Sequence, residues 1–204
     1  MRILLAALLL LSLGVTGAPV TAQELPTIPD PVPVTLERST TALLVMDIQE
    51  SICLPRPACV ESLPVITSLL DWARAEGVSV LHSGTLGGVV LPEAARLPDE
   101  PVVVSSADKF YNTNLDELLR GRGIRTVVMV GTAANGAVLY TSFGATLRGY
   151  TVVVAEDGIS STTDFQTLYV RYQLLNQPGS ANPNNMPLQQ GAVTLSRSDL
   201  LSVQ

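Results

Sequence analysis

Three features of the chain combine residue types that can do chemistry with positions at the ends of apolar stretches. They are Asp47, Lys109 and the glycine-bearing turn 131–137. A carboxylate and an ammonium at adjacent strand ends would form an ion pair in a partly desolvated cleft, where the pKa of each group is perturbed. A helix beginning near Gly136 would direct free backbone N–H groups into the same space, which favours an oxyanion or carboxylate site.

The segment 125–158 predicts the framework that would hold this site. An apolar run at 126–130 leads into the turn, a helical pattern follows and stops at Gly149, and a second apolar run covers 151–155. This order is a βαβ unit, which implies a parallel sheet. Ligands of such sheets lie outside the carboxyl ends of the strands, so the turn is the first place to expect a site.

The remaining segments also alternate between strand and helix patterns. Further strands are expected at 41–46, 78–81, 101–105 and, at an edge, 192–195, and helices at 60–76, 115–122 and 165–175, with loops at 84–101 and 176–190. Asn114 is placed to cap the second of these helices, and either Asp157 or the serines and threonines through Thr163 to cap the third. The predicted fold class is α/β, a three-layer α/β/α sandwich with a mostly parallel, doubly wound sheet.

The N-terminus has the pattern of a secretory signal peptide over residues 1–22. Arg2 precedes an apolar run, and small residues up to Ala22 offer a cleavage site before Gln23. An uncleaved membrane anchor is the alternative, although the apolar run is short for a membrane span. We therefore expect an exported protein, periplasmic or extracellular, with a proline-rich leader or linker at 23–40 and a single domain at 41–204.

The composition narrows the choice of partners. The chain of 204 residues has a formal charge of −6, and cleavage would also remove Arg2. An acidic protein of this kind is a poor candidate for nucleic-acid binding or, after cleavage, for stable membrane association. A hydrophobic content of 47% with 15% charged residues fits an α/β domain with a well-buried sheet.

Cys53 and Cys59 are the only cysteines. In an exported protein a local disulfide between them is the favoured interpretation, and a reactive thiol is the alternative.

Three motifs in this order and spacing resemble the isochorismatase-like cysteine hydrolase family, which includes nicotinamidases and isochorismatases. The motifs are ALLVMDIQ with Asp47, DKFYNTNLDELLRGRGI with Lys109, and VVMVGTAANGAVLYTSFGATLRGYTVVVAEDG. The resemblance covers the chain from about Thr41 to Leu195.

The resemblance implies a catalytic triad of Asp, Lys and Cys, of which only the first two are present. Asp47 and Lys109 match the family's Asp and Lys, but the position of the nucleophilic cysteine is Ala137, and Ala134 replaces the usual threonine. A methyl group cannot attack a carbonyl, so the thioester route is closed. The resemblance also implies a cis peptide between Thr132 and Ala133 and an oxyanion hole from the N–H groups of Ala133 and Ala137.

Four further residues are candidates for binding substrate. They are Gln49, His82, Thr85 and Asn135. Gln49 could orient Asp47 or face solvent, a structural role is favoured for His82, and Asn135 could simply be a turn residue. His82 is the only histidine, and the Asp and two His of metal-binding nicotinamidases are missing, so neither a metal nor another cofactor is expected.

Two functions remain open from the sequence. The first is an exported hydrolase that acts on a small molecule with Asp47 as acid and base, as isochorismatases in the family cleave a vinyl ether without a cysteine. The second is a catalytically inactive protein that keeps the hydrolase fold to bind a small ligand. In either case the resemblance implies a homo-oligomer.

Overall fold

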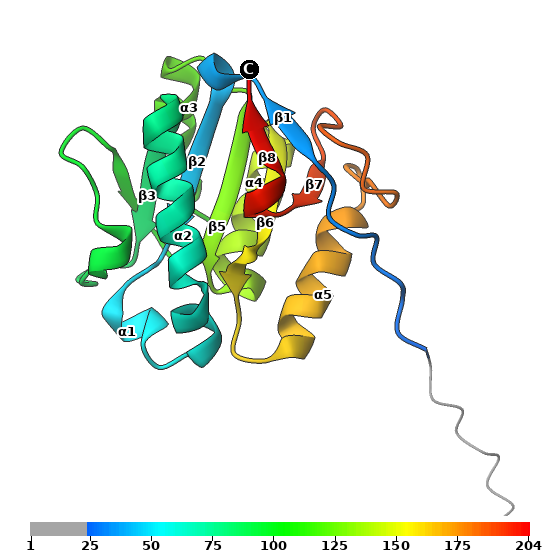
Figure 1. Ribbon diagram of the computed structural model, residues 1–204, viewed down its shortest axis with the longest axis horizontal. Coiled ribbons are helices and arrows are strands. Elements are labelled where there is room, and N and C mark those ends of the chain that lie inside the picture. The colour runs from blue at the N-terminus through cyan, green and yellow to red at the C-terminus, as the bar shows by residue number, and fades with distance from the viewer. Residues whose placement is uncertain (1–23) are drawn as a thin grey trace, which may run out of the picture.

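A six-stranded parallel sheet forms the centre of the molecule in the computed structural model, which describes residues 24–204 (Figure 1). The strand order is β4-β3-β2-β5-β6-β7, and every neighbouring pair is parallel. The strands are β2 (Thr41–Met46), β3 (Ser79–Gly84), β4 (Val102–Val104), β5 (Thr126–Thr132), β6 (Thr151–Ser160) and β7 (Val193–Ser196). Chain order and sheet order reverse between β2 and β5, which is where an open α/β sheet places its ligand crevice.

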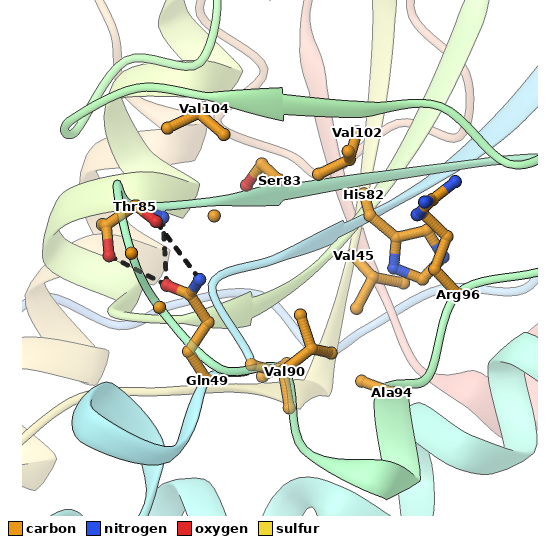
Figure 2. Close-up of a pocket in the computed structure, with 14 residues that line it drawn as sticks. Val45, Gln49, His82, Ser83, Thr85, Val90, Ala94, Arg96, Val102 and Val104 are labelled. Carbon is orange, nitrogen blue, oxygen red and sulfur yellow. Dashed lines mark hydrogen bonds between the residues drawn. The ribbon is translucent and has the colours of Figure 1, made fainter.

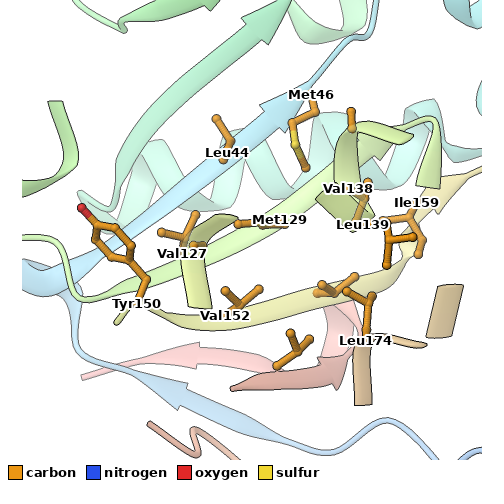
Figure 3. Packing of buried hydrophobic residues seen from close by; sticks show 14 of the residues in the cluster. Leu44, Met46, Val127, Met129, Val138, Leu139, Tyr150, Val152, Ile159 and Leu174 are labelled. Atoms are coloured by element: carbon orange, nitrogen blue, oxygen red, sulfur yellow. The ribbon is translucent and has the colours of Figure 1, made fainter. Parts of the chain in front are cut away.

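Helices cover both faces of this sheet, as the predicted three-layer sandwich requires. One face carries α1 (Glu50–Cys53) and α2 (Pro57–Glu76), and the other carries α3 (Leu115–Gly121), α4 (Leu139–Leu147) and α5 (Asp164–Leu175) (Figure 1). The buried residues of the strands divide between the two layers by alternation. In β2, Leu43 and Val45 pack with α2, whereas Leu44 and Met46 pack with α4 (Figure 3). The predicted fold class is confirmed.

A second, two-stranded parallel sheet lies outside this sandwich. It pairs β1 (Val34–Leu36) with β8 (Leu201–Val203). β1 falls inside the segment expected to be a leader, and it forms because Val34 and Leu36 alternate with an exposed threonine and are buried against the α2 layer. Upstream, the Val32 N–H donates to the Leu195 carbonyl at the outer edge of β7. The predicted signal peptide, residues 1–22, lies outside the described residues.

One of the predicted helix caps is confirmed and two are wrong. Thr163, not Asp157, caps α5, because its hydroxyl accepts from the Gln166 N–H and Gln166 binds back in a capping box. Asp157 instead lies in β6 and accepts hydrogen bonds from the backbone N–H and hydroxyl of Ser198. Asn114 makes no side-chain cap on α3, where the Thr113 hydroxyl accepts from the first N–H of the helix.

β3, β5 and β6 all extend beyond their predicted ends. β3 continues through the polar residues His82 and Ser83, and β6 continues to Ser160 past a register shift opposite Met129 and Gly131. None of the described helices is long and apolar enough to span a membrane.

Candidate active site

Asp47 lies at the carboxyl end of β2, where the backbone turns sharply and its φ is 57°. Its carboxylate is held by two donors from other elements. The Ser83 hydroxyl on β3 donates to Oδ1 over 3.0 Å, and the Lys109 Nζ lies 2.8 Å from Oδ2. The position after a buried strand and the presence of a lysine partner therefore agree with the sequence prediction, but the contribution of Ser83 was missed.

Lys109 is completely buried, with 0% of its side chain exposed. Its Nζ also donates to the carbonyls of Ser105 over 3.2 Å and Ser106 over 2.6 Å. An ammonium has three protons, so Asp47 and these two carbonyls account for all of them. The lysine is thereby fixed and electrostatically balanced without contact to solvent.

The pKa of the Asp47 carboxyl is raised. Burial disfavours the charged form, and this effect outweighs the Lys109 charge and the hydrogen bonds from Lys109 and Ser83, which all act to lower the pKa. A carboxyl group with a raised pKa is better able to hold a proton and deliver it to a substrate.

The turn between β5 and α4 approaches the end of β2 closely. Gly131 pairs with Met46, has a φ of +123°, and leaves so little room that a Cβ would collide with the Met46 carbonyl. A glycine is therefore required here. The peptide between Thr132 and Ala133 is cis, and a π-helical turn, Ala134–Val138, leads directly into α4.

Ala137 belongs to the first turn of this helical segment and is buried, with 3% exposure. The first N–H groups of a helix have no partner within the helix, so this end can receive a negative charge. Thr141, four residues later, lies on the same side of the helix and accepts a hydrogen bond from the Lys109 N–H over 3.1 Å. That bond ties the lysine segment to the helix that carries Ala137.

Gln49 was expected either to orient Asp47 or to face solvent, and its side chain does neither. It is buried, and its Oε1 accepts from the backbone N–H of Thr85 over 3.0 Å and from the Thr85 hydroxyl over 2.9 Å. The carboxamide fills a slot that exists because Gly84 and Gly88 have no side chains, since a Cβ on either would overlap with it. Gln49 and Thr85 thus fix the loop after β3.

His82 points to the opposite side of β3 from Ser83, as neighbours in a strand do. Its Nε2 lies 2.9 Å from Oε2 of Glu100, which also forms a two-point ion pair with Arg74 over 2.8 and 2.9 Å. Burial lowers the pKa of His82, and the neighbouring carboxylate only partly offsets this. The histidine is therefore neutral at pH 7 and part of a side-chain network away from Asp47.

Asn135 lies in the π-helical turn, and its Oδ1 accepts from the Ser161 hydroxyl over 3.2 Å. The Ser161 oxygen in turn accepts from the Asn135 N–H over 3.4 Å. The side chain thus joins the turn to the end of β6.

Cys53 and Cys59 form a disulfide at the corner between α1 and α2, and both are fully buried. Within residues 24–204 no group of three or more His, Cys, Asp or Glu side chains is arranged to hold a metal ion.

The order of these parts matches a known family. The model of the isochorismatase domain matches residues 41–172, which span β2 to α5. The chain belongs to the isochorismatase family. Proteins of this family act on small molecules, and its members include hydrolases.

Individual relatives of this isochorismatase-family chain are distant. The secreted isochorismatase effector Isc1 of Verticillium dahliae is 32% identical over 112 residues, which are 48% of this chain and 59% of the relative. The uncharacterized isochorismatase family protein YecD of Escherichia coli is 28% identical over 63% of this chain and 84% of its own length. The match thus spans about three fifths of the Verticillium protein and most of the bacterial one.

A solved structure supports the same fold. The crystal structure of an isochorismatase family protein from Desulfovibrio vulgaris has a TM-score of 0.67 and 26% identity, over 79% of this chain and 95% of that protein.

Proposed function

We propose that this isochorismatase-family protein is an exported hydrolase that acts on a small molecule without a cysteine nucleophile. The observation that carries the proposal is the buried pair of Asp47 and Lys109, in which burial raises the pKa of the aspartate. An acid in this state can transfer a proton to a substrate, and the N-terminal turn of the helix beside it could hold an anionic group of that substrate.

Vinyl ethers are the substrate class that this arrangement fits, because their cleavage begins with protonation and needs no protein nucleophile. The Asp47 carboxyl would give its proton to the terminal alkene carbon, forming an oxocarbenium ion. Water then adds to the cationic carbon while its proton passes to the Asp47 carboxylate. The resulting hemiketal releases the alcohol and a carbonyl compound as its hydroxyl proton moves to the leaving oxygen, and Asp47 is again protonated.

The role of Lys109 in this scheme is to position Asp47. Its three protons are already bound by Asp47, Ser105 and Ser106, so it orients one carboxylate oxygen and leaves substrate binding to other groups. Ser83 orients the other oxygen.

The test is a panel of amides, carbamates and vinyl ethers incubated with the mature protein and with Asp47→Asn. Loss of a general acid typically lowers the rate by ~10²–10⁴-fold, which is the decrease expected for Asp47→Asn. Asp71→Asn, an exposed aspartate on α2, serves as the matched control and should retain the full rate. Hydrolysis that survives in Asp47→Asn would refute the proposed mechanism.

A second candidate, a catalytically inactive small-ligand-binding protein, is favoured by the complete burial of Lys109 and the methyl group of Ala137. It predicts saturable binding of a small molecule without turnover, unchanged by Asp47→Asn. Equilibrium dialysis combined with product analysis separates the two candidates.

Export is supported by the N-terminal sequence pattern, by the disulfide and by similarity to a relative whose name describes it as secreted. Expression with the natural N-terminus, followed by mass spectrometry of the secreted or periplasmic fraction, should give a chain that begins at Gln23. Retention of the uncleaved chain in the membrane fraction would favour the anchor instead.

A further inference from the structure

A pocket lies between the loop 85–97 and the α2-side face of β3 and β4, and the proposed chemistry does not use it (Figure 2). Its volume is about 260 Å³. Neither Asp47 nor Lys109 nor Ala137 lines it, and the side chains of β3 show why. The Ser83 hydroxyl donates to Asp47, although Ser83 also borders the pocket, whereas His82 turns into the pocket from the other side of the strand.

The walls of this pocket are mostly aliphatic. Val45, Val90, Val102 and Val104 line it, and the last two come from the edge strand β4, where alternation places both on one face. Val102 and Val104 remain about half exposed in the structure. The pocket can thus take up an apolar body and remove these valines from water.

At one end of the pocket, the polar groups already form hydrogen bonds with each other. Gln49 and Thr85 lie there and bind each other (Figure 2). This end offers little to a charged ligand group, because the Gln49 oxygen already accepts two hydrogen bonds.

The other end carries a positive charge without an acidic partner. Arg96 lies there beside His82 (Figure 2), and its Nη1 donates to the carbonyls of Leu97, Pro98 and Glu100. Within the part of the chain that the structure describes, no carboxylate forms a salt bridge with Arg96, and its Nη2 and Nε make no hydrogen bond. These donors are available to an anion.

The other charges nearby do not cancel that of Arg96. Glu100 is the acid closest to His82, but it is engaged by the two-point ion pair with Arg74. Two arginines therefore face one glutamate, and the neutral His82 adds no charge at pH 7.

We propose that this pocket binds a small monocarboxylate with a compact apolar body, such as a substituted benzoate or a branched aliphatic acid. The carboxylate meets the free guanidinium nitrogens of Arg96, and the apolar body lies against Val90, Val102 and Val104. The pocket volume of about 260 Å³ equals that of roughly nine waters, at ~30 Å³ for each water in the liquid. A molecule of about the size of benzoate fits this volume. This site is separate from the chemistry proposed for Asp47 and stands independently of it.

The chain provides its own reporter for the test. His82 is the only histidine and Trp72 the only tryptophan, so the imidazole and indole signals in proton NMR are each unique. Titration of the mature protein with benzoate at pH 7 should shift the His82 ring signals saturably and leave the Trp72 indole signal unchanged. Benzyl alcohol, which has the same ring but no charge, should bind at least about tenfold more weakly.

Two variants and one control test whether benzoate binds at this pocket. Arg96→Gln should weaken benzoate binding by about tenfold or more, whereas Arg122→Gln should not affect it. Arg122 is a matched control, because it is also exposed and bound to a backbone carbonyl but does not line this pocket. Val102→Glu keeps Arg96 and places a negative charge in the pocket at an exposed position, so it should also weaken binding.

Three results would overturn the proposal. They are equal affinity for benzoate and benzyl alcohol, no loss of affinity in folded Arg96→Gln or Val102→Glu, and the absence of a saturable His82 shift. A His82 shift that follows protein concentration without ligand would likewise contradict it, because a second copy of the chain would then occupy the pocket.

Discussion

The Nζ of Lys109 lies 2.8 Å from Oδ2 of Asp47, in surroundings that exclude solvent from the lysine completely. Asp47 follows β2 and Lys109 lies in the segment after β4, on either side of β3, so the two residues meet only in the folded chain. Because a buried charge without a partner is far less stable than a pair, each of these residues depends on the other.

Lys109→Met should therefore reduce the free energy of unfolding by about 3–5 kcal/mol, the usual cost of removing one partner from a buried ion pair. Urea denaturation monitored by circular dichroism gives this value. The double variant Asp47→Asn/Lys109→Met leaves no unpaired charge and should lose less than the sum of the two single variants. Additive losses would mean that the pair is not energetically coupled.

Acid should weaken the fold partly through Glu100. Burial acts to raise its pKa, but hydrogen bonds from Arg74, the Leu97 N–H and His82 prevail and lower the pKa from 4.5 to about 2. As the pH falls below 4.5, the unfolded chain binds this proton before the folded one, so the contribution to stability is lost toward pH 2. Glu100→Gln should make the free energy of unfolding fall less steeply between pH 4.5 and about pH 2. Urea denaturation at several pH values measures this slope. Glu93→Gln, an exposed neighbour, should keep the wild-type slope.

Gly88→Ala should displace the Gln49 carboxamide from Thr85, because the new methyl group overlaps with it. Overpacking of this kind typically costs about 1–3 kcal/mol, which urea denaturation can resolve. Gln49→Ala should leave room for this methyl group. Gly88→Ala should therefore cost less stability in the Gln49→Ala background than in the wild type. Gly121→Ala has open space at its Cβ and should be close to neutral. An equal cost of Gly88→Ala with and without Gln49 would rule out this contact.

The sequence predicts the order of the elements, but β3, β5 and β6 are longer in the structure than their apolar runs predict. Apolar runs identify β2 and the middle of β5 and β6, because buried parallel strands are apolar on both faces. β3 extends further, through His82 and Ser83, since these polar side chains find partners in Glu100 and Asp47. A criterion based on hydrophobicity cannot include polar residues whose partners are distant in the sequence.

The same limit applies to the candidate site. Asp47 and Lys109 stand out because each follows a strand within a recognisable motif. The partner of Gln49 is a loop 36 residues away, and its fit depends on two glycines there, so no local pattern reveals it. The pocket beside Arg96 is equally hidden, because β4 and the preceding loop form it together only in the folded chain.

Ala137→Cys should restore amide hydrolysis if the remaining parts of a cysteine hydrolase are intact. A thiol at this position would lie in the first turn of a helix whose Thr141 binds the Lys109 segment, and a helix N-terminus favours the thiolate. The measurements are ammonia release from simple amides and trapping of the acylated chain by mass spectrometry. Ala137→Ser and the double variant Asp47→Asn/Ala137→Cys serve as controls and should remain inactive or nearly so. An accessible cysteine that alkylates at the rate of an ordinary thiol and shows no turnover would mean that the turn no longer activates a nucleophile, and would favour the small-ligand-binding function.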